Sequence, residues 1–305
     1  MKTNCSSCHS SLDQLLEKKE VALHYEESEE KLTWCSGCGN YGIEKALIRA
    51  LTLENIGFQD CLICYDIGCN GNGSDKTNAY TVHGLHGRVI PLSAGAALAN
   101  SKQKVIAIAG DGATFSEGIN HLVHAIRNDY PVTFICHNNE NYGLTTGQAS
   151  STTRTGIPMN GSPDGVVAPP LNICEFILSL SPTFVARGFS GDVPHTTEIL
   201  REALLHPGFS FVEIMQVCPT YNKSTYQEWF WDRIFYVDSN RKEVSDREVA
   251  RKQAQNIEEH IALGVLYKKP IPSFLERIPQ RNGKTTTLVQ EVKHYDISNL
   301  LLAFI

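Results

Sequence analysis

The chain has 305 residues, of which 42% are hydrophobic and 20% charged, and its formal net charge is −6. This composition is typical of a globular protein and excludes a disordered, collagen-like or coiled-coil chain. The negative charge argues against a nucleic-acid partner, and no apolar run reaches the roughly 18 to 20 residues that span a bilayer. The N-terminal sequence lacks the apolar core of a secretory signal, so we expect a cytoplasmic protein without a membrane partner.

Residues 1–30 are polar and charged, and we expect them to form a peripheral extension. Within them, Cys5, Cys8 and His9 have the spacing of a haem attachment motif, but no export signal accompanies it. Exposed thiols or a small metal clip are the other interpretations of this pair.

From residue 39 onward, short apolar segments alternate with helical patterns. Strands are expected at 61–67, 104–109, 131–137, 183–187 and 209–217, and helices at 40–54, 88–100, 116–128, 171–180 and 195–206. Such alternation predicts an α/β fold in three α/β/α layers, with a doubly wound, mostly parallel sheet and ligands beyond the carboxyl ends of its strands. We assign this domain to residues 31–224. Residues 225–305, with a charged helix expected over 245–263, are predicted to be a helical and coil appendage of the same domain.

The segment 105–148 contains two polar motifs, each at the end of an expected strand. Gly110-Asp111-Gly112 ends the first strand, and Asn138-Asn139 ends the next one about 25 residues later. Glycines let backbone N–H groups approach a diphosphate, and Asp and Asn oxygens suit a hard divalent cation. A lone Gly-Asp-Gly is more often a strand-to-helix turn with an Asp cap. The joint spacing favours a site, and the pair of motifs resembles the thiamine diphosphate signature.

Ten cysteines in a reducing compartment indicate metal or redox chemistry. Three pairs have the spacing Cys-x-x-Cys, at 5/8, 35/38 and 61/64, and each could bind zinc or a corner of an iron–sulfur cluster. Cys61 and Cys64 lie on an expected buried strand. We interpret them, with Cys136 and Cys174, as small apolar core residues.

Four further segments indicate which family of thiamine diphosphate proteins the chain resembles. They are Trp34–Asn40, Ile67–Cys69, His83–Arg88 and Cys218–Asn222. Together with the diphosphate motifs they resemble the β subunit of the 2-oxoacid:ferredoxin oxidoreductases over roughly residues 30 to 225, with a lean toward the 2-oxoglutarate branch. The resemblance implies the diphosphate-side fold of thiamine diphosphate enzymes.

The resemblance also implies the site residues. One [4Fe–4S] cluster is expected on Cys35, Cys38, Cys69 and Cys218, although composition alone leaves a Cys₄ zinc site open. Mg²⁺ is expected on Asp111, Asn139 and the carbonyl of Asn141. Contacts to the diphosphate are expected from Gly110, Gly112, Ala113, Gly143, Leu144 and Thr145. His86 is expected near the reacting end as a catalytic residue, with an oriented structural histidine as the alternative.

The implied reaction is thiamine diphosphate-dependent oxidative decarboxylation of a 2-oxoacid, such as 2-oxoglutarate, with coenzyme A. It gives acyl-CoA and CO₂, its electrons pass through the cluster to ferredoxin, and it can run in reverse. The pyrimidine-side domain belongs to an α subunit, so we expect αβ heterodimers doubled to (αβ)₂. Two alternatives stay open: a non-redox thiamine diphosphate-dependent decarboxylase subunit and a zinc-stabilised non-catalytic module.

The chain departs from the family pattern at Asn72. Relatives commonly place a basic residue there that can meet a substrate carboxylate, and Lys76 and Arg88 are the candidates to replace it.

Overall fold

The computed structural model describes residues 33–238, 240–281, 287–291 and 298–302. The predicted extension over 1–30, including Cys5 and Cys8, lies outside the described residues.

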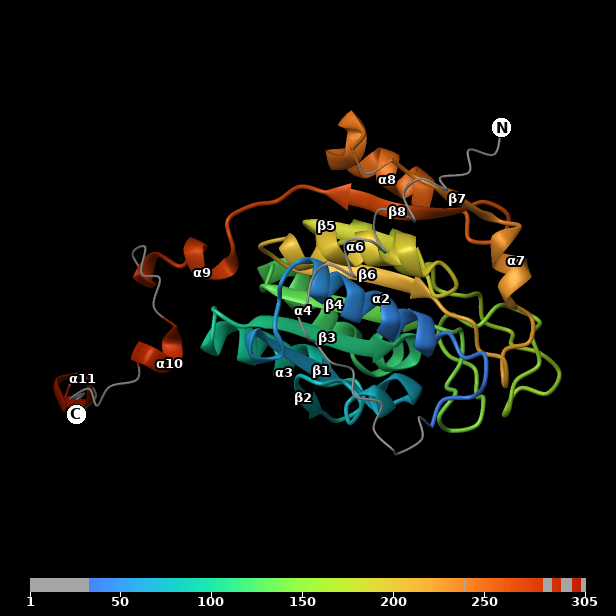
Figure 1. Ribbon diagram of the computed structural model, residues 1–305, viewed down its shortest axis with the longest axis horizontal. Coiled ribbons are helices and arrows are strands. Elements are labelled where there is room, and N and C mark those ends of the chain that lie inside the picture. Colours follow the sequence, from blue (N-terminus) through green and yellow to red (C-terminus); the bar gives the residue numbers. More distant parts are fainter. Residues whose placement is uncertain (1–32, 239, 282–286, 292–297, 303–305) are drawn as a thin grey trace.

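The described chain is organised around one eight-stranded sheet (Figure 1). Its strands are β1 (Cys61–Tyr65), β2 (Tyr80–His83), β3 (Lys104–Gly110), β4 (Val132–Asn138), β5 (Phe184–Phe189), β6 (Ser210–Met215), β7 (Ile234–Tyr236) and β8 (Ile261–Lys268). Their order is β2-β1-β3-β4-β6-β5-β8-β7, and only the pair β5–β8 is antiparallel. The predicted α/β fold with a mostly parallel sheet is therefore confirmed.

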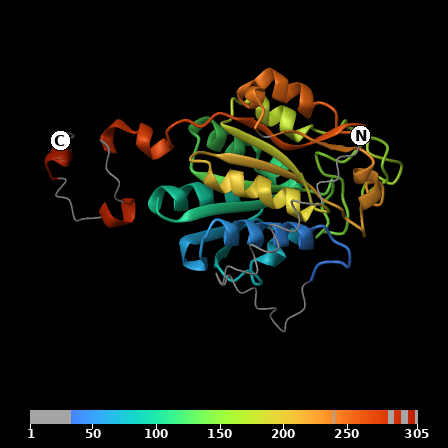
Figure 2. The same ribbon diagram turned by 45° about the horizontal axis from the view of Figure 1, so that its top comes forward.

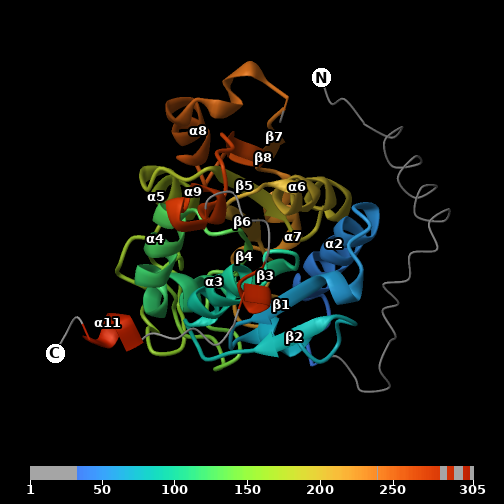
Figure 3. The same ribbon diagram turned by 90° about the vertical axis from the view of Figure 1, so that its left-hand side faces the viewer.

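Helices cover both faces of the sheet, so the molecule has three layers. The helices are α2 (Asn40–Leu53), α3 (Val89–Ala99), α4 (Ile119–Asn128), α5 (Ile173–Ser179), α6 (Val193–Leu205), α7 (Gln227–Trp231), α8 (Arg247–Ala254), α9 (Phe274–Arg277), α10 (Leu288–Glu291) and α11 (Ser298–Leu302). The view along the sheet shows α3, α4 and α5 on one face and α2 and α6 on the other (Figure 3). Figure 2 shows α2 and α6 side by side, in agreement with their direct packing.

Each face of the sheet buries its own apolar core. Ala107, Phe134 and Phe211 face the α3–α5 layer, whereas Ile106 and Ile135 face the α2–α6 layer. Because both faces are covered, β3 and β4 are nearly continuous apolar runs, and this pattern is what made them predictable.

Strand connectivity creates a crevice at one end of the sheet. The chain leaves β1 for β2 on one side and returns to β3 on the other side of β1. At such a switch point the connections after the two strands diverge, and ligands bind beyond the carboxyl ends. The motifs Gly110-Asp111-Gly112 and Asn138-Asn139 follow β3 and β4 at this end, as predicted.

The tail differs from its prediction. The helix expected over 245–263 is wrong in its second half, since α8 ends at Ala254 and Ile261–Lys268 forms the buried strand β8. β8 pairs with β5 and β7 pairs with β8, so the tail adds two strands to the sheet and is more than a helical and coil appendage. The domain boundary after residue 224 stays a prediction. In the described residues, no helix has the length and apolar character that crossing a bilayer requires.

Candidate active site

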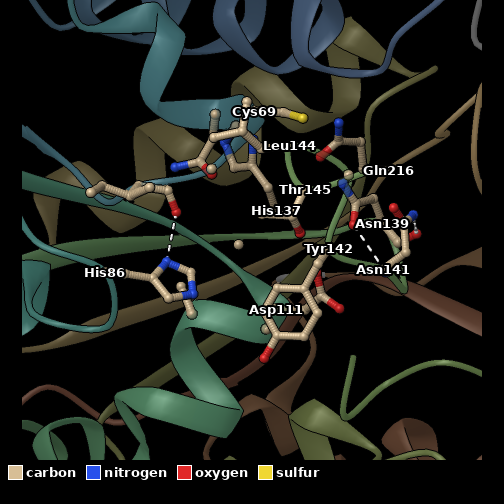
Figure 4. A pocket seen from close by; sticks show the side chains of 17 residues that line it. Cys69, His86, Asp111, His137, Asn139, Asn141, Tyr142, Leu144, Thr145 and Gln216 are labelled. Atoms are coloured by element: carbon tan, nitrogen blue, oxygen red, sulfur yellow. Dashed lines mark hydrogen bonds between the residues drawn. The ribbon is translucent and has the colours of Figure 1, made fainter. Parts of the chain in front are cut away.

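A cavity of about 130 Å³ opens at the carboxyl ends of β1, β3 and β4 (Figure 4). It is lined by all six residues expected to contact a diphosphate, and also by His86, Cys69, Asp111, Asn139 and Asn141. These residues come from four separate segments of the chain. The structure thus brings the predicted diphosphate, magnesium and catalytic residues to one pocket, together with one of the four predicted cluster ligands.

Asp111 lies at the base of this pocket and is buried. Its Oδ2 accepts hydrogen bonds from the hydroxyls of Ser150 and Thr152, both at 2.5 Å. Burial raises the pKa of Asp111 to about 6, and the two hydroxyls oppose that rise. A carboxylate held so firmly and so poorly hydrated favours a bound cation.

Gly112 is required because the ring of Tyr142 lies against it. A Cβ at this position would stand 2.3 Å from Cε1 of Tyr142. The Tyr142 hydroxyl in turn donates to Glu117, 3.0 Å from Oε1. Glu117 ends a π-helical turn, Ala113–Glu117, that separates the Gly-Asp-Gly motif from α4. The helix predicted at 116 therefore begins only at Ile119.

The two asparagines of the second motif point in different directions. The Asn138 side chain is buried, where Nδ2 donates to Oε1 of Glu213 at 2.8 Å and Oδ1 lies 3.0 Å from the Thr152 hydroxyl. Asn139 faces the pocket, and its Oδ1 accepts from the backbone N–H of Asn141 at 3.1 Å. This local turn holds Asn139 and Asn141 together, and both line the pocket that Asp111 also lines.

His86 is held on both ring nitrogens. Nδ1 lies 2.9 Å from the carbonyl oxygen of Ile67 and 3.3 Å from Oδ1 of Asp66, and Nε2 lies 3.4 Å from Oε2 of Glu117. Asp66 is buried and accepts from the backbone N–H groups of Gly87 and Val89 at 2.9 and 3.2 Å. Asp66 therefore fixes the loop that carries His86. Sequence reasoning missed this role, although Asp66 follows an apolar strand just as Asp111 does.

The four predicted cluster cysteines lie in one neighbourhood. Burial, together with the charges of Cys38, Cys218 and Cys35, raises the pKa of the Cys69 thiol to about 12. Cys38 and Cys35 share a turn in which the Cys38 N–H donates to the Cys35 carbonyl at 3.0 Å. In the described part of the chain, no three His, Cys, Asp or Glu side chains are gathered closely enough to hold a single metal ion.

The remaining described cysteines are core residues. Cys61, Cys64, Cys136 and Cys174 are all buried. Their burial confirms that they are core residues, and Cys174 in addition donates from Sγ to Oε2 of Glu213 at 3.0 Å.

The position of Asn72 is away from the pocket lining. Its Nδ2 donates to the Thr33 hydroxyl at 2.6 Å. Arg88 donates to the carbonyls of Gly87 and Glu117 at 3.0 and 2.9 Å, and neither Arg88 nor Lys76 is among the described residues that line the cavity. In this arrangement neither cation takes the place in the pocket that the sequence comparison with the family predicted for a basic residue.

Two pocket residues were missed altogether by sequence reasoning. His137, the penultimate residue of β4, has its Nδ1 2.9 Å from Oδ1 of Asn40, and burial lowers its pKa to about 3. Gln216 follows β6 and also lines the pocket. The sequence feature that could have indicated these two pocket residues is their position at the ends of strands. Many other residues lie at strand ends, so this feature alone does not identify a site.

Comparison with known proteins places these features in a family. Residues 66–214 match the family model of the thiamine pyrophosphate enzyme C-terminal TPP-binding domain. Residues 218–282 match the family model for the C-terminal region of the β chain of pyruvate ferredoxin oxidoreductase.

Two curated relatives are similar along most of their length. The 2-oxoacid:ferredoxin oxidoreductase subunit β of Saccharolobus solfataricus is 31% identical, over 85% of this chain and 94% of the relative. Subunit β of 2-oxoacid:ferredoxin oxidoreductase 1 from Aeropyrum pernix is 35% identical, over 82% of each chain.

A solved structure has the same fold. It is the 2-oxoglutarate:ferredoxin oxidoreductase from Magnetococcus marinus with 2-oxoglutarate, coenzyme A and succinyl-CoA bound, with a TM-score of 0.82 and 29% identity over 93% of this chain and 98% of that one. The likeness in sequence and in fold extends over nearly the whole sheet and its crevice, so the chain belongs to the β subunits of the 2-oxoacid:ferredoxin oxidoreductases and carries their thiamine diphosphate-binding domain.

Proposed function

We propose that this chain, assembled with an α subunit, catalyses the coenzyme A-dependent oxidative decarboxylation of a 2-oxoacid of the 2-oxoglutarate type. The products are acyl-CoA and CO₂, and the electrons leave through one [4Fe–4S] cluster to ferredoxin. One observation carries the proposal. Cys69, a proposed cluster ligand, lines the same cavity as Asp111 and the residues proposed to hold the diphosphate, so the reacting centre and the electron acceptor are neighbours.

The residues present fit thiamine diphosphate with Mg²⁺. When bound, the cofactor supplies a nucleophilic carbon for the keto group and an electron sink for loss of CO₂. Asp111 and the oxygens of Asn139 and Asn141 form the hard donor set that Mg²⁺ prefers beside phosphates. Gly112 and Ala113 would offer backbone N–H groups, and Thr145 a hydroxyl, to the diphosphate.

His86 is proposed to act on the substrate side of the pocket. The carbonyl oxygen of Ile67 anchors the ring at Nδ1. Because a carbonyl oxygen only accepts hydrogen bonds, Nδ1 must carry a proton. Nε2 then carries the lone pair, and it faces Glu117 at 3.4 Å. Once Nε2 takes up a proton, which the neighbouring Glu117 carboxylate stabilises, it would deliver that proton to a substrate oxygen while Asp66 holds the loop.

The four cysteines fit an iron–sulfur cluster in type and number. A [4Fe–4S] cluster takes one thiolate per iron, so its ligands surround a body wider than one ion. Cys38 and Cys218 lie close enough to Cys69 to raise the pKa of its thiol, and Cys218 likewise raises the pKa of Cys38, because like charges repel. A bound cationic cluster core would remove this repulsion.

The metal content of the αβ complex tests the proposal. We would purify the complex anaerobically and measure iron, acid-labile sulfide and zinc, followed by an electron paramagnetic resonance spectrum after dithionite reduction. We expect about four irons and four sulfides per β chain. The reduced-cluster signal should be lost in Cys218→Ser and kept in Cys61→Ala, a core cysteine used as the matched control. Zinc without sulfide would contradict the redox function.

The acid is tested separately on the same complex. We would compare 2-oxoglutarate, pyruvate and branched-chain 2-oxoacids as substrates, with coenzyme A and an artificial electron acceptor. The proposal predicts the highest kcat/KM for 2-oxoglutarate or a related diacid. Preference for a monoacid would agree with the missing cation at Asn72 and would overturn this part of the proposal.

A further inference from the structure

One buried amide joins the pocket to the cysteines. Gln216 follows β6, and its backbone N–H donates to the Asn138 carbonyl at 2.8 Å, which extends the β4–β6 pairing by one bond. Its side chain lines the pocket, and its Nε2 lies 3.5 Å from Sγ of Cys38. Figure 4 shows Gln216 beside Asn139 at the edge of the pocket.

The contact between Gln216 and Cys38 is built by close packing of the backbone. Gly39 follows Cys38, and a Cβ there would stand 2.6 Å from Cγ of Gln216. The Gly39 N–H also donates to the Val217 carbonyl at 3.0 Å. The loop carrying Cys38 is thus fastened to the chain on the C-terminal side of Gln216, and only glycine allows this approach.

The orientation of the amide follows from the chemistry of its neighbour. A thiolate sulfur only accepts hydrogen bonds, so the amide nitrogen must face Cys38 and the amide oxygen must face away. Among the described residues, Oε1 of Gln216 is buried and has no hydrogen-bond partner. A buried oxygen left without a donor is costly, so a packing role alone does not explain a glutamine here.

We propose that Gln216 is a positioning residue that raises the reduction potential of the cluster through its N–H···S hydrogen bond to Cys38. The inference rests on the proposed function, because it requires a cluster ligated by Cys38. Reduction adds negative charge to the cluster and its sulfurs. An N–H group directed at one sulfur stabilises the reduced form more than the oxidised form, and hydrogen bonds to cluster sulfurs are among the features that set these potentials.

Two substitutions test the role of the amide. Gln216→Glu keeps the shape of the side chain and replaces the donor by a carboxylate oxygen, and Gln216→Leu removes both polar atoms. Gln103→Leu is the control, because Gln103 also donates from a half-buried amide, to the Cys61 carbonyl at 3.3 Å, but lies at the opposite end of β3.

The measurement is the midpoint potential of the cluster in the αβ complex, from a redox titration followed by electron paramagnetic resonance. We expect both Gln216 variants to keep wild-type iron and sulfide, and to be harder to reduce by about tenfold, or about 59 mV for a one-electron couple. Gln103→Leu should match the wild type.

An unchanged midpoint in both loaded variants would overturn the inference and leave the proposed function intact. Loss of iron from both variants would also overturn it, since the residue would then be structural. A wild-type complex without iron and sulfide would instead refute the proposed function, so the two failures are distinguishable.

Discussion

Replacing Glu44 by Gln should remove a pH dependence from the stability of this fold. Glu44 lies on α2 with 8% of its surface exposed, and its Oε1 accepts from the Thr77 hydroxyl at 2.6 Å. Burial raises its pKa from 4.5 to about 7, and the single hydrogen bond from Thr77 opposes this only in part. The carboxyl group is therefore protonated in the folded chain at pH values where the unfolded chain has already lost that proton.

The sign and size of the effect follow from the two pKa values. Between pH 4.5 and 7 the folded state binds more protons than the unfolded state, so the free energy of unfolding falls as the pH rises through this range. The difference between the two pKa values corresponds to about 3 kcal/mol in the free energy of unfolding, and this contribution is lost by pH 8. The amide introduced by Glu44→Gln is neutral at every pH, and its carbonyl could still accept from Thr77.

Urea unfolding of the full-length chain at pH 5, 6, 7 and 8, followed by circular dichroism, measures this contribution. Glu44→Gln should be close to the wild type at pH 5 and more stable by up to about 3 kcal/mol at pH 8. Glu259→Gln, at an exposed position, is the control and should follow the wild type. If the free energy of unfolding changed with pH equally in Glu44→Gln and in the wild type, the reasoning would be refuted. The Glu44 carboxyl group would then be ionised in the folded chain.

Three further predictions concern the pocket and its packing. Asp111→Ala should abolish thiamine diphosphate binding and turnover of the αβ complex, and retained cofactor with retained turnover would contradict its assignment. Thr152→Val removes the hydroxyl that lies 2.5 Å from Asp111 Oδ2. A hydrogen bond to a charged group contributes about 1.5–3 kcal/mol, so the affinity for thiamine diphosphate should fall roughly tenfold or more. A fluorescence titration of the complex with the cofactor measures this change. Gly42→Ala would place a Cβ 2.0 Å from the Ser190 carbonyl oxygen and should destabilise the chain by about 1–3 kcal/mol. Gly95→Ala, on α3 with no atom within 4 Å of the new Cβ, should stabilise it by about 0.5–1 kcal/mol. If urea unfolding gave the reverse order of stabilities, α2 would have moved to accommodate the Cβ at residue 42.

The strands that carry the site were predictable because their environment is uniform. β3 and β4 are buried on both faces, so their sequences are nearly continuous apolar runs, and the polar motifs at their ends mark where they stop. β8 is equally apolar but follows a charged helical stretch. A short apolar run does not by itself distinguish a buried strand from a continuing helix, and the pairing of β8 with β5 decides between them. β2 was missed because this four-residue edge strand is mostly exposed.

The candidate site was predictable only where a residue belongs to a motif. The main omissions, His137, Gln216 and Asp66, each lie at or just after a strand end, where the direction of the side chain depends on the register of the neighbouring strands. Gly110 pairs with His137 in the β3–β4 register, and Asn138 pairs with Met215 just before Gln216. These pairings bring residues from distant segments to one pocket, and nothing in the local sequence specifies them.

The sheet also contains a buried ion pair, which holds neighbouring polar side chains in place and adds little to the stability of the fold. Arg187 and Glu213 are opposite each other in the β5–β6 register, 2.8 Å apart, with 0% and 2% of their side chains exposed. Burying two charges costs about as much as their attraction returns, so an apolar pair would serve the core equally well. Glu213 however also accepts from Asn138, and Oδ1 of Asn138 lies 3.0 Å from the hydroxyl of Thr152, whose shorter contact, at 2.5 Å, is with Asp111. The ion pair thus lies at one end of a series of buried polar contacts, through Asn138 and Thr152, whose other end is the carboxylate proposed to hold Mg²⁺.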